Sequence, residues 1–276
     1  NESAITHILR GDDHLKNSAK HLQLMDAMDF KKPEFIHLPM ILGPDGSRLS
    51  KRHGAMNILE YKDQGFLPEA MLNYLVRLGW SLGDQEIFNI QEMIDSFDIK
   101  NLNKSSAKFD LEKLEWVNQQ HLAVTNNADL TEFLKQNSSV KNLPSLGAIK
   151  NFADAYKPRI KNLNELLGYF DLLYSDEFGV DDNTAKKFLR PEILGPFNDL
   201  IEIFNQIEWD AESIHQSISS ICEKHSIGFG KIGQPLRVAI TGGTESPSID
   251  LTITLLEREK VIYRLKKAIE YISNQS

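Results

Sequence analysis

The sequence predicts a mostly helical protein whose first part is half of a doubly wound α/β nucleotide fold. Residues 4–9 alternate weakly and residues 35–42 form an apolar run, and both patterns are typical of short strands. Between them, apolar residues from Leu15 to Met25 recur at helical spacing. Strand, helix, strand is half of such a sheet. Beyond residue 60 we find helical periodicity and no strand signal of weight.

Several helix ends can be predicted from single residues. Pro68 suits a first helical position, and the apolar stripe that follows it stops at Gly79. Asn89 and Glu92 have the spacing of a capping box. Asp110 is placed to cap the helix that follows it.

The second half of the chain is predicted to consist of helices joined by polar loops. Residues 126–127 and 137–145 are rich in Asn and Ser, which is typical of loops. Helices are expected at Ile149–Tyr156, Leu163–Tyr174, Ile193–Phe204, Ala211–Lys224 and from Ile249 to the last residue.

Length and composition limit the classes of protein to consider. A chain of 276 residues is expected to form two or more domains. A net charge of −8 argues against a uniformly basic nucleic-acid binder, although a local basic face can still bind RNA. The single cysteine, Cys222, excludes an internal disulfide and a Cys-rich zinc site, and suits a reducing cytoplasm. We expect no signal peptide, and no apolar run approaches the ~18 residues of a membrane span.

Residues 43–53, here called the basic loop, contain the densest group of candidate functional residues. Pro44-Asp45-Gly46 is a turn signal, because Pro presets φ, Asp caps its own turn and Gly takes positive φ. The cations Arg48, Lys51 and Arg52 follow, with the hydroxyl of Ser50 among them. A loop between a strand and a helix suits phosphate binding, whereas the alternative is a solvated basic loop. It is not a Walker A loop.

Five blocks of sequence resemble one family. Arg48-Leu49-Ser50-Lys51-Arg52 resembles the "KMSKS" signature of class I aminoacyl-tRNA synthetases. Residues 5–14, 67–75, 109–114 and 234–242 resemble blocks of bacterial-type glutamyl-tRNA synthetase, in family order. Because the blocks extend over most of the chain, the resemblance is more specific than a single signature loop.

The resemblance implies the C-terminal portion of such a synthetase, beginning inside its catalytic domain. The sequence contains no His-x-Gly-His motif, which the family uses to receive ATP. We therefore expect this chain alone to be inactive, although its parent is a ligase. The implied domains are the residual half of a Rossmann-like catalytic domain with the basic loop (1–60), a helical stem-contact domain (61–125) and two all-helical anticodon-binding subdomains (126–175 and 176–276).

The resemblance assigns catalytic roles to Lys51, Ser50 and Arg48. A flexible ammonium such as that of Lys51 can follow the charge that develops on the α-phosphate and the departing pyrophosphate, with Ser50 assisting. Arg48 stands where the family often has Lys, and its planar guanidinium keeps the charge but changes the geometry.

Arg10 is the residue that the resemblance assigns to the glutamate substrate. It follows the first predicted strand, at the carboxyl end where α/β sheets bind ligands. A bidentate pair with a carboxylate is the physical reason for an arginine there. The alternative is a structural arginine that pairs with Asp12 or Asp13.

The ATP-binding positions implied by the family are Asp13, His14 and the backbone of Met40 and Ile41. The last two fit an ordinary core strand as well. Asp12-Asp13-His14 could suggest a metal, but three consecutive residues seldom converge on one ion. We expect no metal site.

Residues 228–233 match the dinucleotide-binding fingerprint by letter, and we reject that interpretation. No strand signal precedes them, and Pro235 follows where a helix should already be running. A loop between helices, near the tRNA anticodon, is the preferred interpretation.

The anticodon-binding residues implied by the family centre on Arg237. An arginine here stacks on an anticodon base, and Ser246, Pro247 and Ile249 line the same pocket. The alternative for Arg237 is a helix-end arginine that pairs with an acidic neighbour. Family members often carry Thr at the position of Ser246.

A looser correspondence concerns Arg159 and Lys161, which follow Pro158. These two cations resemble a basic spot that reads the third anticodon base.

The predicted function is that of the C-terminal portion of a glutamate–tRNA ligase. The implied substrates are L-glutamate, tRNA(Glu) and ATP with Mg²⁺, and no structural zinc is expected. We expect a cytoplasmic monomer with no membrane partner, and whether tRNA(Gln) is also accepted stays open. The alternatives are a non-catalytic tRNA-binding module and a helical scaffold of synthetase ancestry.

Overall fold

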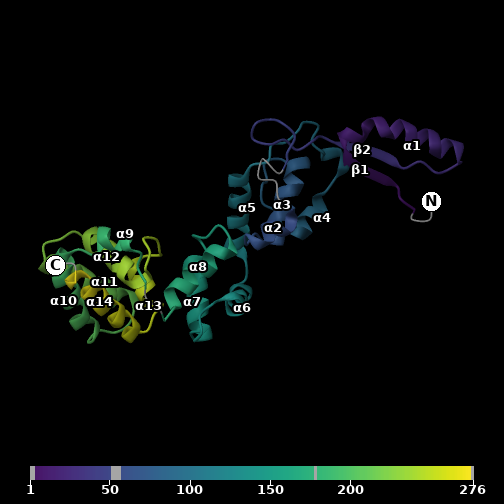
Figure 1. The fold of residues 1–276 in the computed structure, drawn as a ribbon. Coiled ribbons are helices and arrows are strands. Elements are labelled where there is room, and N and C mark those ends of the chain that lie inside the picture. Colours follow the sequence, from purple (N-terminus) through teal and green to yellow (C-terminus); the bar gives the residue numbers. More distant parts are fainter. Residues whose placement is uncertain (1–3, 51–56, 177–178, 275–276) are drawn as a thin grey trace. The chain divides into compact units, whose positions relative to one another are not determined.

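The computed structural model describes residues 4–50, 57–176 and 179–274, and it divides into two compact units (Figure 1). The N-terminal unit runs to Val124 and includes Lys161–Leu163. The C-terminal unit comprises Thr125–Ile160 and the chain from Asn164 onward. This division does not test the finer four-domain prediction.

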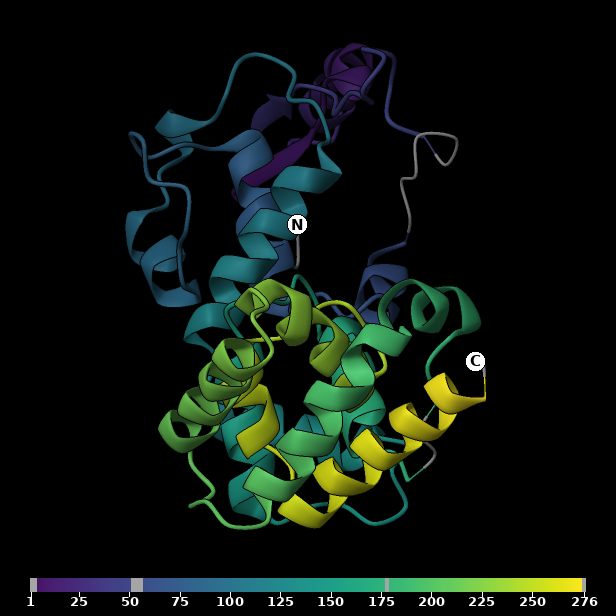
Figure 2. The ribbon, with the colours of Figure 1, turned by 90° about the vertical axis from the view of Figure 1, so that its left-hand side faces the viewer.

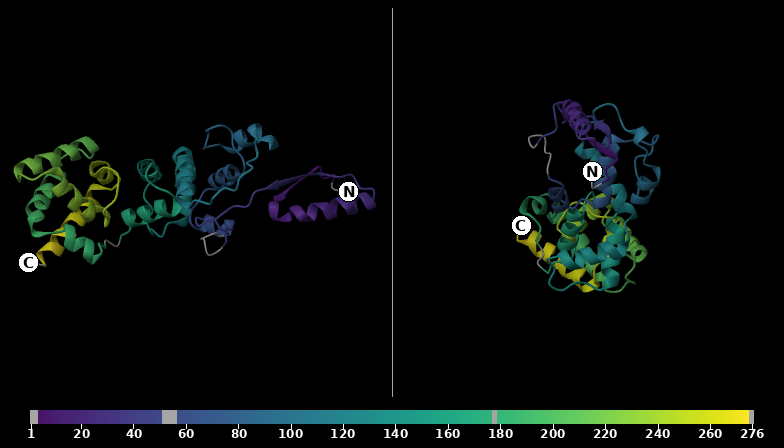
Figure 3. Two further views of the ribbon diagram at one scale, coloured as in Figure 1. Left: turned by 90° about the horizontal axis from the view of Figure 1, so that it is seen from above. Right: turned by 90° about the vertical axis from the view of Figure 1, so that its right-hand side faces the viewer.

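The N-terminal unit begins with the predicted strand–helix–strand element. Its members are β1 (His7–Gly11), α1 (Leu15–Ala27) and β2 (Glu34–Leu38). The strands are parallel, with His7 opposite Glu34 and Gly11 opposite Leu38. Helix α1 runs along one side of the pair (Figure 3). In the described residues the sheet has two strands, so the predicted half-sheet is confirmed.

Both strands end elsewhere than predicted. The strand expected at 4–9 lies at His7–Gly11, and the strand expected at 35–42 ends at Leu38. Pro39 follows directly, and it has no N–H with which to extend the ladder. Leu42 instead forms isolated bridges with Arg48 and with Lys108. The backbone that precedes the basic loop is therefore held from two sides.

The described residues 57–124 form four α-helices joined by loops, and their predicted helix ends are confirmed. Pro68 occupies the first turn of α3, and Asn89 and Glu92 exchange both hydrogen bonds of a capping box. Asp110 accepts a hydrogen bond from the backbone N–H of Lys113, at 3.1 Å. The helices are α2 (Ile58–Asp63), α3 (Pro68–Gly79), α4 (Ile90–Ser96) and α5 (Leu111–Val124).

The C-terminal unit is a set of packed helices around an aromatic and aliphatic core (Figure 2). Phe152, Phe170, Phe197 and Phe204 are fully buried within it. The helices are α6 (Asn127–Asn137), α7 (Leu146–Tyr156), α8 (Leu163–Tyr174), α9 (Asp182–Phe188), α10 (Leu194–Phe204), α11 (Ala211–Lys224), α12 (Phe229–Thr241), α13 (Ile249–Thr254) and α14 (Arg258–Ser273).

A buried arginine connects three of these helices. The side chain of Arg264 on α14 is 1% exposed, and it donates hydrogen bonds to the carbonyl oxygens of Ile240, Leu173 and Ser175. These carbonyls lie at the C-terminal ends of α12 and α8, where backbone acceptors have no helical partner. Burial lowers the pKa of Arg264 to about 10, so the side chain remains a cation at neutral pH. It fixes the ends of the two helices that carry the site described below.

Two sequence predictions for this unit are wrong. Residues 228–233 were expected to form a loop, but helix α12 begins at Phe229 and continues through Pro235. Proline fits helical φ, and burial of Ile232 and Leu236 stabilises a helix that lacks one internal hydrogen bond. The single helix expected from Ile249 onward is broken into α13 and α14. Among the described helices, none combines the length and apolar character needed to cross a bilayer.

Candidate functional site

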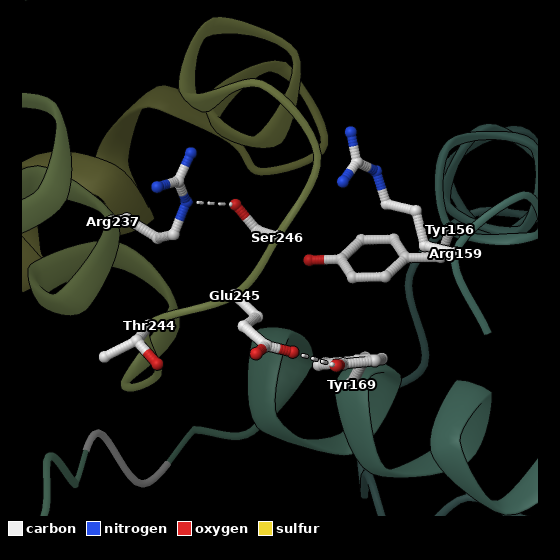
Figure 4. Close-up of a pocket in the computed structure, with 7 residues that line it drawn as sticks. All are labelled: Tyr156, Arg159, Tyr169, Arg237, Thr244, Glu245 and Ser246. Atoms are coloured by element: carbon white, nitrogen blue, oxygen red, sulfur yellow. Dashed lines mark hydrogen bonds between the residues drawn. The ribbon is translucent and has the colours of Figure 1, made fainter. Parts of the chain in front are cut away.

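A pocket of about 300 Å³ lies in the C-terminal unit (Figure 4). Tyr156 ends α7, Arg159 follows in the next turn, Tyr169 lies on α8 and Arg237 on α12. The loop after α12 closes the pocket. The lining residues are Tyr156, Arg159, Tyr169, Arg237, Thr244, Glu245 and Ser246.

The guanidinium of Arg237 is held by hydrogen bonds along its edge. Its Nε donates to the Ser246 hydroxyl at 2.8 Å, and the other nitrogens donate to Gln234 Oε1 at 2.6 Å and to the Pro247 carbonyl at 3.4 Å. All of these bonds lie near the guanidinium plane, so they fix its orientation without occupying its faces. The partners are neutral, so the alternative of an acidic neighbour does not describe these contacts.

The pocket is electropositive on the side of Arg237 and Arg159. Burial, and secondly the nearby Arg159 charge, lower the pKa of Arg237. Two like charges that converge at a partly buried site repel each other, and an electron-rich ligand relieves that repulsion. A nucleobase face or a phosphate satisfies this requirement.

The carboxylate of Glu245 is held on the opposite side. The Tyr169 hydroxyl donates a hydrogen bond to Glu245 Oε2 at 3.3 Å (Figure 4). Burial, and secondly this carboxylate, raise the pKa of Tyr169. The ring of Tyr156 packs against that of Tyr169 with centroids 5.2 Å apart. The pocket thus combines cationic donors, neutral hydroxyls and one acceptor.

Gly242 turns the chain from α12 into the pocket loop. It ends the helix with a left-handed φ of 74°, which an L side chain rarely adopts. A Cβ at this position would also lie 3.0 Å from the Gly179 carbonyl oxygen. The tight turn places Thr244, Glu245 and Ser246 beside Arg237.

The other predicted anticodon residues lie in different surroundings. Pro247 contributes its carbonyl oxygen to Arg237, whereas Ile249 is buried at the start of α13 and is not a lining residue. Lys161 belongs to the N-terminal unit and pairs with Glu115 at 2.8 Å.

Sequence reasoning did not single out Gln234, Tyr156 or Tyr169. The spacing of Gln234 and Arg237, one helical turn apart, could have indicated their contact. The tyrosines gave no signal, because aromatic residues at helical spacing are more often core.

Arg10 lies in a polar cluster of the N-terminal unit. Its guanidinium donates to the Ser18 hydroxyl at 2.5 Å and to His37 Nε2 at 3.4 Å, and lies 5.0 Å from the Phe35 ring centroid. Another nitrogen lies 3.4 Å from His21 Nδ1. The structure therefore gives Arg10 a hydroxyl, two imidazole rings and an aromatic ring as partners, and not the aspartates of the structural alternative.

The predicted ATP residues Asp13 and Met40 both lie beside Gly11, and Asp13 also lies close to Arg48. Asp13 Oδ2 is 3.7 Å from a guanidinium nitrogen of Arg48 and 4.0 Å from His14 Nε2. A Cβ on Gly11 would lie 2.6 Å from Asp13 Oδ1 and 3.6 Å from Met40 Sδ. The turn after β1 and the basic loop therefore meet in space. The carbonyl oxygen of Ile41 accepts a hydrogen bond from Leu49 N at 3.0 Å, and its side chain packs against the core cluster that contains Tyr61 and Phe66.

The described part of the basic loop has the predicted turn. Asp45 Oδ1 accepts hydrogen bonds from the Ser47 amide and hydroxyl, each at 2.9 Å, and Gly46 has a φ of 80°. Ser50 is partly buried. Lys51 lies outside the described residues. Among the described residues, no group of three His, Cys, Asp or Glu side chains could hold a metal ion.

Two family models match the chain. The model "tRNA synthetases class I (E and Q), catalytic domain" matches residues 2–116, and "Anticodon binding domain" matches residues 126–269. The chain belongs to this class of aminoacyl-tRNA synthetase. The predicted combination of a class I catalytic part and a helical anticodon-binding part is confirmed.

The relatives narrow the class to glutamate–tRNA ligases. The chain is 43% identical to the ligase of Francisella tularensis subsp. novicida (strain U112), with 98% of this chain and 59% of the relative covered. It is 43% identical to that of Legionella pneumophila (strain Paris), covering 97% and 58%. A crystal structure of the ligase from Elizabethkingia meningosepticum CCUG26117, in complex with its amino acid, matches with a TM-score of 0.85 and 30% identity, covering 98% and 58%. The matched region is the C-terminal portion of a glutamyl-tRNA synthetase, and the resemblance read from the sequence is confirmed.

Proposed function

We propose that this chain provides the anticodon recognition of a glutamate–tRNA ligase, with tRNA(Glu) as its RNA partner. The observation that carries the proposal is the Arg237 pocket. It offers an oriented guanidinium, a second cation in Arg159 and fixed hydroxyls, within a domain that the anticodon-binding model matches.

The pocket's chemistry fits an unpaired base. Because the hydrogen bonds of Arg237 lie at its edge, a base can stack on the guanidinium face. Arg159 is exposed and free to follow a phosphate or a base edge. Neutral groups that can form hydrogen bonds with a base edge are supplied by Thr244, Ser246 and the Tyr156 hydroxyl, which also line the pocket.

We propose that the N-terminal unit contributes to glutamate activation in the whole ligase. ATP with Mg²⁺ and L-glutamate are the substrates. Lys51, Ser50 and Arg48 would stabilise charge on the phosphates, and Asp13, His14 and the Met40-Ile41 backbone would contact ATP. The side chain of Arg10 would pair with the glutamate carboxylate by exchanging its weak contact with His21.

We further propose that the chain acts as a monomer in the cytoplasm, with Lys161 near the RNA. Whether the chain also accepts tRNA(Gln) is decided by measuring its affinities for tRNA(Glu) and tRNA(Gln) under the same conditions. The alternative is that the chain is a non-catalytic tRNA-binding module. It also predicts RNA binding, but it predicts that Lys51 contributes nothing to glutamate activation in any assembly that contains the chain.

The test is binding of tRNA(Glu) and of a tRNA with an unrelated anticodon by the intact chain, followed by fluorescence anisotropy. Arg237→Ala should weaken tRNA(Glu) binding by about 1–3 kcal/mol, with little change in salt dependence, if the guanidinium stacks. Arg237→Lys is the matched control, because it keeps the charge and removes the plane. Equal affinity for both tRNAs, unchanged in Arg237→Ala, would refute the proposal.

A further inference from the structure

A second and larger pocket lies next to the Arg237 pocket in the C-terminal unit. Its volume is about 500 Å³. It is formed by the end of α9, the turn that leads into α10 and the first turns of α12. We call it the α9–α12 pocket. Its lining cations are Lys187, Arg190 and Lys231.

The charge of this pocket is unbalanced. Its lining contains three cations and one carboxylate, that of Glu192. Between residues 179 and 274, none of these three cations lies in an ion pair, whereas Lys224 and Lys267 on nearby helices pair with Asp199 and Glu270. The first turn of α12 has no acidic residue either. All three cations are exposed and can therefore reach a ligand.

The remaining lining indicates the kind of anion. Phe188, Ile193, Ile227 and Pro235 form an apolar floor beneath the cations. A free inorganic anion gains nothing from such a floor. The sugar–phosphate backbone of a nucleic acid does, because ribose carbons pack on apolar groups while phosphate oxygens bind cations.

One side chain connects this pocket to the Arg237 pocket. Gln234 lines the α9–α12 pocket, and its Oε1 accepts from Arg237 at 2.6 Å while its Nε2 donates to the Thr244 carbonyl at 2.9 Å. Lys231 and Arg237 lie on the same helix, six residues and roughly 9 Å apart along its axis.

We propose that the α9–α12 pocket binds the sugar–phosphate backbone of the RNA, beside the nucleotide whose base enters the Arg237 pocket. Lys187, Arg190 and Lys231 bind phosphate and Gln234 fixes the register between backbone and base. The inference rests on the proposed RNA-binding function and extends it to a second contact of a different kind.

The first test compares salt dependence. The intact chain is titrated with an RNA stem-loop bearing the glutamate anticodon over a range of salt concentrations. The triple variant Lys187→Ala, Arg190→Ala, Lys231→Ala should lower the log–log slope by about two units, at roughly 0.7 per lost single-strand phosphate contact. Its preference for the glutamate anticodon over an unrelated one should persist, because bases are read elsewhere. The matched control removes the same charge at Lys141, Lys150 and Lys266, exposed lysines of the same unit that do not line this pocket.

The second test locates the phosphate. Stem-loops are prepared with one methylphosphonate, which is uncharged, at successive loop positions. At one or two positions the substitution should weaken wild-type binding about tenfold and leave the triple variant unaffected, because the contact is already lost. Circular dichroism checks that the variants keep their helices.

The outcomes separate this inference from the proposed function. If wild type does not distinguish anticodons, the proposed function fails. Two results would overturn the inference even if wild type distinguishes anticodons. Either the triple variant keeps the wild-type salt slope, or the lysine control lowers the slope by as much as the triple variant does. In both cases the α9–α12 pocket is not a backbone site.

Discussion

The strand–helix–strand element and the C-terminal helices differ in how much apolar surface they bury within this chain. In α1 the one buried side chain is Ser18, while Leu15, Leu24 and Met28 are exposed. In the C-terminal unit, every long helix contributes fully buried aliphatic or aromatic side chains. One part of the chain buries its apolar side chains in a core, and the other leaves many of them exposed.

The difference has consequences for function. A buried leucine contributes about 1.5–3 kcal/mol relative to an exposed one, so the apolar side chains of α1 leave considerable stabilisation unrealised. A site built on this element cannot be held as firmly as one built on α8 and α12. The Arg237 pocket has that support, since Arg264 binds the ends of both helices. We therefore expect RNA recognition, and not amino-acid activation, to be the activity that this chain performs by itself.

The largest expected effect is on glutamate activation. Positioning of two reactants can lower a reaction barrier by up to ~7–11 kcal/mol. For positioning ATP and glutamate, the described residues of β1, α1 and β2 provide a two-stranded sheet. Glutamate-dependent ATP–pyrophosphate exchange by the 276-residue chain should therefore stay near background, with or without tRNA. The control is Lys51→Ala, in protein free of host synthetase. Exchange clearly above that control would mean that the strand–helix–strand element does position substrates.

A smaller effect concerns stability, and a matched pair of leucines tests it. Leu200 on α10 is 0% exposed and Leu24 on α1 is 61% exposed. Leu200→Ala should lower the free energy of unfolding of the C-terminal unit by about 2–5 kcal/mol. Leu24→Ala should change the stability by less than about 0.5 kcal/mol. Urea unfolding, with hydrogen exchange of each unit, measures both. Similar losses at the two sites would show that α1 packs as tightly as α10.

The smallest effect is a pH dependence of the N-terminal helices. Burial lowers the pKa of His121, against a weaker opposing influence of Glu69, and the ring contacts Asn73 Oδ1 at 2.9 Å. Below the ordinary histidine pKa of ~6.5, the unfolded chain takes up a proton that the folded state resists. The contribution of His121 to the free energy of unfolding is therefore fully present above that pH. It falls as the pH decreases below ~6.5, by under about 1.4 kcal/mol per pH unit.

Amide hydrogen exchange in α3 and α5, measured at neutral and mildly acidic pH, reports this change. His121→Gln removes the titrating group and should flatten the profile. A variant that keeps the full wild-type pH dependence would assign the effect to other groups.

The local features of the fold were predictable and the tertiary ones were not. Pro68, Asn89 and Asp110 act on backbone groups within one turn of themselves, so their residue type sufficed. Helix α12 was missed because Pro235 argues against a helix locally, while burial of its neighbours favours one. In the pocket, Arg237 was found by resemblance. Tyr156 and Tyr169 were not found, because only the packing of α7 on α8 shows that these tyrosines face a cavity.

The most direct test of where this chain's function lies uses two RNA stem-loops that differ in one anticodon base. Their dissociation constants are measured with wild type and with Arg237→Lys, which keeps the charge. We expect wild type to prefer the glutamate anticodon, and Arg237→Lys to lose most of that preference while binding both RNAs with the wild-type salt slope. If Arg237→Lys keeps the wild-type preference, the Arg237 pocket does not read the base.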